Sequence, residues 1–479
     1  MKLIERGIGF VSVLILARLL TPADFGLVAM AMSVVALIEL MGAFGFDTAL
    51  IQRQDATREH FDTAWTFGVL FGIASALLLI AAAVPAAEFY RDPRITLILP
   101  ALAIGALLQG FENVGPVLFR KSLDFTSEFI FLLAKRLAGF AVTVSLALLY
   151  RNFWALVAGI ITSKLIATVI SYVMHSYRPR FSLAARADLF HFSKWLFISN
   201  LLRFSQENAD KFILGRAIGP RDLGIYNVAS EIAALPATVL IAPINRAVFP
   251  AYAKLLDSSS QLQIVFLQVV GNVAIIATPL AFGIACLAEP VVAVLLGPQW
   301  AEAVPLLRIF VAVGLVGALQ SNLFSLLLAQ GHAKANTMMA LALLILYLPA
   351  VTFASVHAGA VGAAWTHLVM AFVGLVPLYL TFFRLTGFSR RAYIATLWRP
   401  LIAAGVASAV LTSALNVLDP RLGTYPLALL FAGSAIGAVV YALSLGALWL
   451  ASGRPHATAE HAILLFIRRR AGLPTAVTP

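Results

Sequence analysis

The chain has 479 residues, of which 61% are hydrophobic and only 12% are charged, and its formal net charge is +12. A soluble domain usually carries about twice that charged fraction, which excludes the soluble class. Lys and Arg collect in the cytoplasmic loops of membrane proteins, so the positive charge does not require a nucleic-acid partner, and none is expected. The single cysteine, Cys286, excludes an internal disulfide and a cysteine-based metal site. The sequence has no HExxH motif and no GxxxxGK[ST] loop, so we expect no metal, no cofactor and no P-loop nucleotide hydrolysis.

Apolar segments of about 20 residues recur along the whole chain, and each is long enough to cross a ~30 Å hydrocarbon core as a helix. The first has Lys2 and Arg6 ahead of it, like a signal peptide, but Arg18, Pro22 and Asp24 follow in place of a cleavage site. The loops between segments are short, which leaves no room for a soluble domain. We therefore predict an all-α integral membrane protein with about fourteen transmembrane helices, at residues 2–20, 25–46, 63–87, 95–118, 128–149, 153–174, 193–214, 223–246, 263–287, 303–328, 337–356, 360–383, 396–417 and 426–450.

The distribution of basic residues predicts the orientation of these helices. With the N-terminus inside, the inner segments hold about three times as many Lys and Arg residues as the outer turns. Both termini are therefore expected in the cytoplasm, which requires an even number of helices.

An internal repeat divides the chain. Residues 16–26 match residues 214–224, and further on Pro93 and Pro100 align with Pro298 and Pro305. One period spans six predicted helices, so the two copies have the same orientation, and transporters built in this way bind substrate between the halves. The aligned positions of the first motif are Arg18, Pro22, Asp24 and Gly26, with Arg216, Pro220, Asp222 and Gly224 as their counterparts.

The repeat predicts two six-helix lobes and a C-terminal helix pair. The predicted parts are an N-terminal lobe at 1–175, a cytoplasmic inter-lobe loop at 176–192, a second lobe at 193–383, additional helices 13 and 14 at 396–450, and a basic cytoplasmic tail at 451–479.

The repeated motif itself reads as a structural turn. Thr21 is a candidate N-cap, Pro22 fits the first helical position, and Asp24 completes a capping box at the start of the second helix. In the second copy, Gly219 stands where the cap would be. Direct contact with substrate is the alternative interpretation.

Charged residues inside predicted spans are candidates for function, because such a residue at mid-bilayer costs about 2.5–3.5 kcal/mol on insertion scales. Lys164 and Arg203 lie near the middle of their spans, whereas the others are close enough to an interface for their side chains to reach it. The six basic residues of this kind are Lys135, Arg136, Lys164, Arg203, Lys211 and Arg308.

The seventh predicted helix carries a polar stripe formed by Asn200, Arg203, Glu207, Asp210 and Lys211, which recur at spacings of three and four. One interpretation is an ion-pair ladder that ties helices together. The other is a cavity wall in which Arg203 binds an anionic group, because a guanidinium keeps its charge and donates two parallel hydrogen bonds.

Two acidic residues lie deep in predicted spans, Glu39 and Glu231. A carboxyl group in a low-dielectric surrounding can bind and release a proton, so each is a candidate for coupling to an ion gradient. Glu207 and Asp210 are further candidates. The alternative is a neutral or paired carboxyl with a structural role.

Three segments together resemble the Wzx-type polysaccharide transporters, namely Leu-Ala-Arg-Leu-Leu-Thr-Pro-Ala-Asp-Phe-Gly at 16–26, Glu-Asn-Ala-Asp-Lys-Phe-Ile-Leu-Gly at 207–215 and Leu-Gly-Ile-Tyr-Asn-Val-Ala at 223–229. These transporters are oligosaccharide flippases of the MOP superfamily, related to the MATE exporters and to the lipid II flippase. The resemblance implies two lobes that work by alternating access in the bacterial inner membrane, and no enzymatic activity. Members of the family usually have more residues before the first motif, so the resemblance also predicts an abbreviated first helix or a late start of the sequence.

The resemblance further implies a substrate, an undecaprenyl-pyrophosphate-linked oligosaccharide flipped to the periplasmic leaflet for exopolysaccharide or O-antigen assembly. Membrane lipids, a polysaccharide polymerase and export machinery are the implied partners, and a proton or sodium ion is the implied coupling ion. With this substrate, we expect a positively lined cavity in which Arg203 and Lys164 bind pyrophosphate. The supporting residues are Lys211, Arg308, Lys135 and Asn200.

The rival functions that remain open are a MATE-like ion-coupled drug exporter, a lipid II flippase, and a membrane enzyme that is either a polysaccharide polymerase or a polyprenyl-dependent glycosyltransferase. The mixed charges of the deep residues disfavour the exporter, whose cationic substrate favours carboxylates. The short outer loops disfavour the polymerase.

Overall fold

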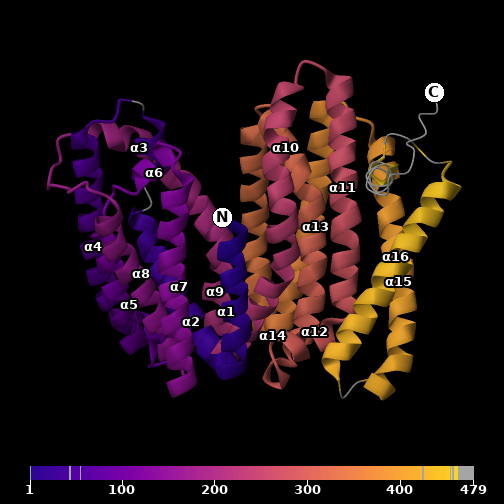
Figure 1. The fold of residues 1–479 in the computed structure, drawn as a ribbon, viewed down its shortest axis with the longest axis horizontal. Coiled ribbons are helices and arrows are strands. Elements are labelled where there is room, and N and C mark those ends of the chain that lie inside the picture. Colours follow the sequence, from indigo (N-terminus) through magenta and orange to yellow (C-terminus); the bar gives the residue numbers. More distant parts are fainter. Residues whose placement is uncertain are drawn as a thin grey trace. The chain divides into compact units, whose positions relative to one another are not determined.

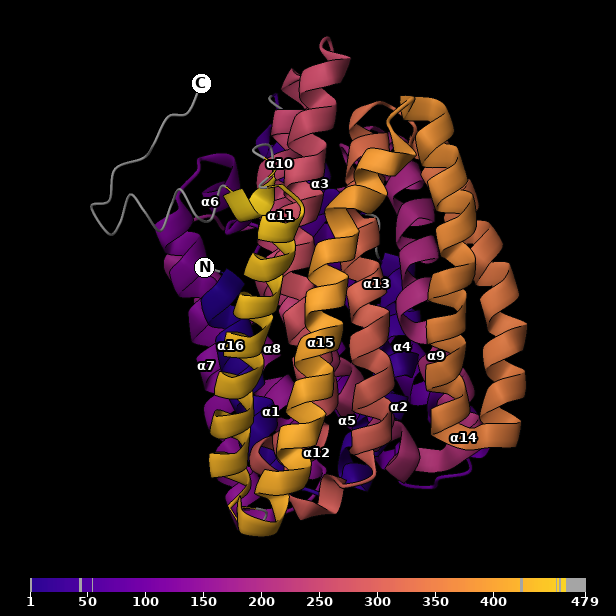
Figure 2. The same cartoon turned by 90° about the vertical axis from the view of Figure 1, so that its right-hand side faces the viewer.

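The computed structural model describes residues 2–42, 45–53, 55–422, 425–453, 455 and 458–461, and within these ranges it consists of helices and connecting turns without a strand (Figures 1 and 2). The chain divides into two compact units. The first contains Met1–Asn227 with Val351–Ala360, and the second contains Val228–Ala350 with Val361–Pro479. The boundaries of these units do not coincide with those of the internal repeat. The two six-helix lobes therefore stay a prediction.

The first unit is built around long helices joined by short ones. Its elements are α1 (Lys2–Leu19), α2 (Pro22–Glu39), η1 (Leu40–Gly42), α3 (Phe46–Gln52), α4 (Arg58–Tyr90), α5 (Ile95–Gly110), α6 (Val117–Lys121), α7 (Phe125–Tyr150), α8 (Trp154–Met174) and most of α9 (Arg186–Pro236).

The second unit continues from the end of α9 with a π-helical segment, η2 (Ala237–Ile241). Its other elements are α10 (Ala242–Lys254), α11 (Ser259–Cys286), α12 (Ala288–Leu295), η3 (Pro298–Trp300), α13 (Ala303–Ala329), α14 (Ala333–Thr386), α15 (Arg390–Leu422) and α16 (Pro426–Ala451).

The all-α membrane fold predicted from the sequence is confirmed. Ten helices among the described residues are long and apolar enough to cross a membrane, and α5 and part of α1 are shorter apolar helices. Two of the ten contain a glycine with a non-helical backbone, Gly219 in α9 and Gly359 in α14. Each of these helices is therefore two helices in succession, close to the breaks expected from the sequence. The number fourteen stays a prediction.

Two predicted spans are wrong in their extent. The span expected at 25–46 ends at Glu39, and the span expected at 95–118 ends at Gly110. The second difference has a local cause, because the Asn113 side chain accepts a hydrogen bond from the Gly115 backbone and the Asn113 backbone donates to the Ser171 hydroxyl. These bonds turn the chain after Gly110, so the helix cannot continue.

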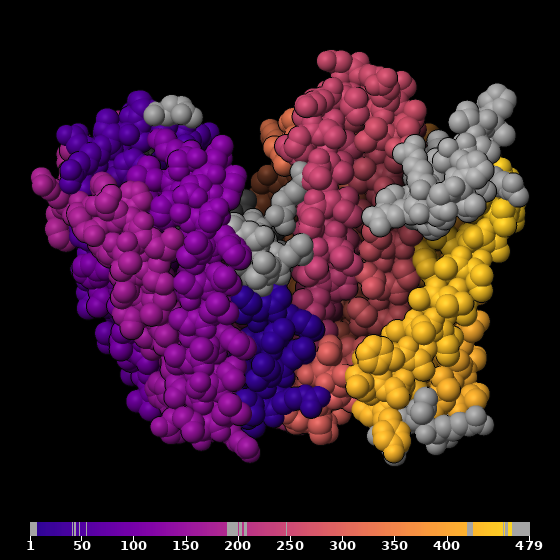
Figure 3. All heavy atoms as spheres, in the orientation of Figure 1, coloured from indigo at the N-terminus to yellow at the C-terminus, as the bar shows by residue number. Residues whose placement is uncertain are grey.

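Large apolar side chains cover the outer helix faces, which is the surface expected of helices in contact with lipid tails. On α16, which is yellow on the surface of the second unit in Figure 3, Phe431 and Leu443 are each 69% exposed. On α4, Leu77 is 63% exposed.

The predicted capping box is present at the turn between α1 and α2. The Asp24 carboxylate accepts hydrogen bonds from the Thr21 backbone at 2.9 Å and from the Thr21 hydroxyl at 2.6 Å, and Pro22 begins the helix. The other carboxylate oxygen of Asp24 accepts a hydrogen bond from the Phe153 backbone at 3.1 Å. Asp24 therefore fastens the turn to the start of α8.

The two copies of the repeated motif lie against each other within the first unit. A Cβ atom on Gly26 would stand 1.6 Å from the Pro220 carbonyl oxygen, and one on Gly224 would stand 1.9 Å from the Pro22 carbonyl oxygen. Only glycine fits at both positions. The aligned glycines are thus explained by a reciprocal backbone contact. The aligned Arg216 donates to the carbonyl of Phe89 at 2.7 Å.

We predict that Gly26→Ala destabilises the protein by about 1–3 kcal/mol, because the added methyl group meets backbone that cannot move aside independently. Thermal unfolding of the purified protein in detergent measures this. Gly405→Ala is the control, since nothing lies within 4 Å of its added Cβ and alanine favours the helix. Equal unfolding temperatures for the Gly26 variant and the wild type would contradict the prediction.

Residues 175–185, here called the strap, lead from α8 to α9 and are bonded to the first turns of α4. Asp62 accepts hydrogen bonds from the Tyr177 hydroxyl at 2.5 Å and from the Arg180 backbone at 2.8 Å. Thr66 and Thr63 accept from the backbones of strap residues 182 and 185, at 3.0 and 3.2 Å. The strap is therefore part of the first unit and not a free linker.

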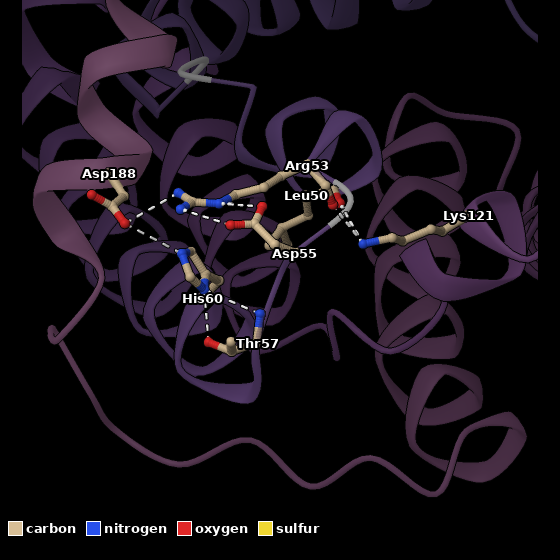
Figure 4. A network of polar contacts seen from close by, with 7 residues as sticks. All are labelled: Leu50, Arg53, Asp55, Thr57, His60, Lys121 and Asp188. Atoms are coloured by element: carbon tan, nitrogen blue, oxygen red, sulfur yellow. Dashed lines mark hydrogen bonds and ion pairs between the residues drawn. The ribbon is translucent and has the colours of Figure 1, made fainter.

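A network of polar contacts continues from the strap into the start of α9 (Figure 4). Asp188 reaches Arg53 at 3.1 Å and His60 at 3.5 Å. The other ring nitrogen of His60 accepts from the Thr57 backbone at 3.2 Å. Nearby, Lys121 donates to two backbone carbonyls at the end of α3. This network fixes the first turn of α9 to the entry of α4.

We predict that Asp62→Ala releases the strap and speeds tryptic cleavage after Arg180 about tenfold or more. That is the effect of losing a hydrogen bond to a charged acceptor. The measurement is limited proteolysis followed by mass spectrometry. Asp55→Ala is the control, because the exposed Asp55 carboxylate bonds to Arg53 and not to the strap. Unchanged cleavage in the Asp62 variant would argue against the role of this clamp.

Candidate functional site

The first unit contains a cavity of about 740 Å³ lined by residues of the helices from α2 to α8. Its wall combines aromatic rings with amides, hydroxyls and six charged side chains. A cavity of this composition among membrane-spanning helices is suited to water and polar ligands.

Three predicted site residues line this cavity, Lys164 from α8, Lys135 from α7 and Glu39 from the last position of α2. The Lys164 ammonium donates to the Gln109 side-chain oxygen and lies 3.9 Å from a carboxylate oxygen of Glu39. The side chains of Lys164 and Glu39 are 33% and 36% exposed. A predicted anion-binding residue and a predicted ion-coupling residue are therefore neighbours.

Close helix packing positions this group. A Cβ atom on Gly72 of α4 would lie 2.6 Å from the Gly110 Cα of α5, so the two helices approach at bare backbone. Two residues before Gly110, the Leu108 carbonyl accepts a hydrogen bond from the Thr168 hydroxyl of α8 at 2.7 Å. Gln109 lies between these contacts and is held against Lys164.

A second ion pair lies elsewhere in the cavity wall. Arg120 donates to Glu128 at 2.9 Å, and the Lys135 ammonium stands 5.1 Å from the centre of the Phe131 ring. The described lining contains three acidic and three basic side chains, Glu39, Glu112, Glu128, Arg120, Lys135 and Lys164. In this cavity acidic residues from neighbouring segments balance the bases. The positively lined cavity predicted from the sequence was one between the two lobes, and it stays a prediction.

The polar stripe of α9 is only partly described. The Lys211 ammonium donates to the Asn208 side chain at 3.2 Å, and Asp210 accepts from the Lys211 backbone at 2.8 Å. Asn200 is half-buried. The side chains of Arg203 and Glu207 lie outside the described residues, so the ion-pair ladder and the anion-binding role of Arg203 stay predictions.

The two remaining predicted residues belong to the second unit. Arg308 donates to Glu289 at 3.0 Å and to the Ala285 carbonyl at 3.2 Å, at the edge of a separate cavity of about 420 Å³. Glu231 is exposed on α9. The first cavity therefore gathers Glu39, Lys135 and Lys164 but neither of these two.

Sequence reasoning missed Gln109, which contacts Lys164 directly. The available signal was a polar amide inside an otherwise apolar stretch. It also missed the Arg120–Glu128 pair, because both residues fall at the ends of predicted spans, where charged residues are common.

Comparison with known proteins places the chain in a family. Residues 15–305 match the family described as "Polysaccharide biosynthesis protein". The chain belongs to this family. It is 26% identical over 403 residues to the lipopolysaccharide biosynthesis protein WzxC of Escherichia coli (strain K12), covering 82% of this chain and 81% of WzxC. It is 29% identical over 441 residues to the succinoglycan biosynthesis transport protein ExoT of Rhizobium meliloti (strain 1021), covering 91% and 88% of the two chains.

A solved structure supports the fold. The inward closed conformation of the lipid II flippase MurJ has a TM-score of 0.76, with 94% of this chain and 98% of that chain covered at 11% identity. The resemblance to the Wzx-type polysaccharide transporters is thus confirmed at the level of the family, and the all-α fold inferred from the sequence is also that of MurJ.

We predict that the cavity is open to water. In a background with Cys286→Ser, which removes the only native cysteine, Ser163→Cys in the cavity wall should react with an anionic methanethiosulfonate about tenfold or more faster than Leu77→Cys on the outer face of α4. Thiolates, which are the reactive form, are rare in hydrocarbon. Labelling rates in permeabilised membrane vesicles measure this, and equal rates would show that the cavity is dry.

Proposed function

We propose that this family member is a flippase that moves polyprenyl-pyrophosphate-linked oligosaccharide units from the cytoplasmic to the periplasmic leaflet by alternating access. The units serve exopolysaccharide or O-antigen assembly, and the protein catalyses no reaction. Support comes from the relatives, one named as a succinoglycan transport protein and one as a lipopolysaccharide biosynthesis protein. The fold of a lipid II flippase is compatible with this reading.

One observation carries the proposal to the level of residues, the position of Lys164 in a polar cavity among membrane-spanning helices. A pyrophosphate is anionic and needs a cation and hydrogen-bond donors when it leaves water. The sugar units need polar side chains and aromatic faces, which Gln109 and Phe71 offer in the same wall. The polyprenyl tail stays in lipid.

The rival functions have less support. A lipid II flippase shares the fold, but fold likeness at 11% identity does not choose a substrate. A MATE-like exporter of cations has no support from the relatives, which belong to polysaccharide biosynthesis. A polymerase has none either, since one relative is named as a transport protein.

The setting and the energy source are part of the proposal. We place the protein in the bacterial inner membrane with both termini in the cytoplasm, as the basic residues predict. A proton or sodium gradient drives the cycle, with Glu39 as the coupling candidate that lines the cavity. A polymerase and export machinery would receive the flipped unit.

We predict that Lys164→Gln lowers the flipping rate about tenfold to a hundredfold, because a hydrogen bond to a charged group is worth about 1.5–3 kcal/mol. Lys164→Arg, which keeps the charge, should retain more activity. The assay is the transfer of a defined lipid-linked oligosaccharide across proteoliposomes under an imposed ion gradient. Lys334→Gln, an exposed lysine at the start of α14, is the control. Full activity of a well-folded Lys164→Gln protein would remove Lys164 from the mechanism.

A further inference from the structure

The cation assigned to the substrate has an anionic neighbour in the cavity wall. The Lys164 ammonium lies 3.9 Å from the Glu39 carboxylate, and Gln109 accepts one of its hydrogen bonds. The three side chains come from three different helices, α8, α2 and α5. Their meeting is therefore a product of the tertiary fold and not of local sequence.

The Lys164–Glu39 pair differs from the other ion pair of the cavity. Arg120 and Glu128 form a charge-assisted hydrogen bond at 2.9 Å. Lys164 and Glu39 are further apart than hydrogen-bonding distance, and about a third of each side chain is exposed. A pair of this kind contributes little free energy and exchanges its partner easily.

We propose that the Glu39 carboxylate competes with the pyrophosphate of the substrate for the Lys164 ammonium. Without substrate the carboxylate neutralises Lys164, and the pyrophosphate of the substrate displaces it. This inference rests on the proposed function and adds a mechanism by which an empty transporter shields its binding cation.

Displacement has a consequence for protons. Once phosphate oxygens contact Lys164, Glu39 faces an anion without its counter-ion, and like charges disfavour the ionised form. A proton from water then binds a Glu39 carboxylate oxygen, and it leaves again when the phosphate leaves. The other charged groups lining the cavity are Glu112, Glu128, Arg120 and Lys135, whose charges sum to zero.

The test is calorimetric titration of inorganic pyrophosphate into the purified full-length protein. We expect Glu39→Gln to bind pyrophosphate roughly twofold to fivefold more tightly than wild type, the range that a partly exposed ion pair supplies. Lys164→Gln should bind more weakly. In the double variant Glu39→Gln/Lys164→Gln the gain from the first substitution should vanish, because its effect acts through the lysine.

Two controls make the comparison specific. Glu128→Gln removes a cavity carboxylate whose partner is Arg120, and Glu289→Gln removes a paired carboxylate in the second unit. Neither should tighten pyrophosphate binding as Glu39→Gln does. If every carboxylate variant inside the cavity tightens binding equally, the effect is general charge and the specific competitor role is overturned.

Proton uptake gives a readout that a structural role would not move. Titrations in buffers of different ionisation enthalpy report the protons bound per pyrophosphate, and wild type should take up a larger fraction of a proton than Glu39→Gln. The comparison cancels the titration of pyrophosphate itself. Equal affinity for pyrophosphate and equal proton uptake in wild type and Glu39→Gln would overturn the proposed role of Glu39.

The two proposals fail differently. If wild type binds pyrophosphate and Lys164→Gln weakens it, while Glu39→Gln changes nothing, the anion site stands and only the competitor falls. If wild type binds no pyrophosphate, or Lys164→Gln binds it unchanged, the assignment of the anion site in the proposed function falls, and the competitor falls with it.

Discussion

The cost of placing charge away from water governs this structure. A cation among membrane helices needs a cavity or a partner. Lys164 has both, and Arg308 has Glu289 at 3.0 Å. Among the basic residues whose burial the structure describes, Arg399 of α15 is the most buried. Its side chain is 6% exposed, and its guanidinium donates to both carboxylate oxygens of Glu460 at 2.8 and 3.3 Å. That pair fixes the segment after α16 to the bundle, because breaking it would leave a buried charge uncompensated.

Close approach of helix backbones makes the polar cavity possible. Gly72 and Gly110 bring α4 against α5, and the Gly139 carbonyl lies 3.0 Å from where a Cβ of Gly159 would stand, which brings α7 against α8. In a membrane, where no hydrophobic driving force pulls helices together, such contacts supply the packing energy. The helices meet tightly at these points, and the larger polar side chains fit between them at other levels.

Local features of the fold could be predicted from the sequence, and long-range partners could not. The capping box of Thr21 and Asp24 and the breaks near Gly219 and Gly359 depend on neighbouring residues, so composition and spacing indicate them. Lys164 could be recognised as costly in lipid, but its partners come from α2 and α5, and no spacing in the chain encodes which helices meet. The balanced charge of the cavity also depends on which helices lie side by side, so residue spacing does not indicate it.

The choice of lysine in the cavity wall has a physical reason. An arginine would hold a carboxylate through two parallel hydrogen bonds, whereas the Lys164 ammonium is a compact charge with three donors that rotate freely. Gln109 takes one donor, and Glu39 stands near without a hydrogen bond. The ammonium can therefore turn from carboxylate to phosphate while Gln109 still holds it in place. A cavity whose charges balance costs less free energy among lipid tails than a positive one. Glu39 therefore stabilises the substrate-free protein and also allows Lys164 to exchange carboxylate for phosphate.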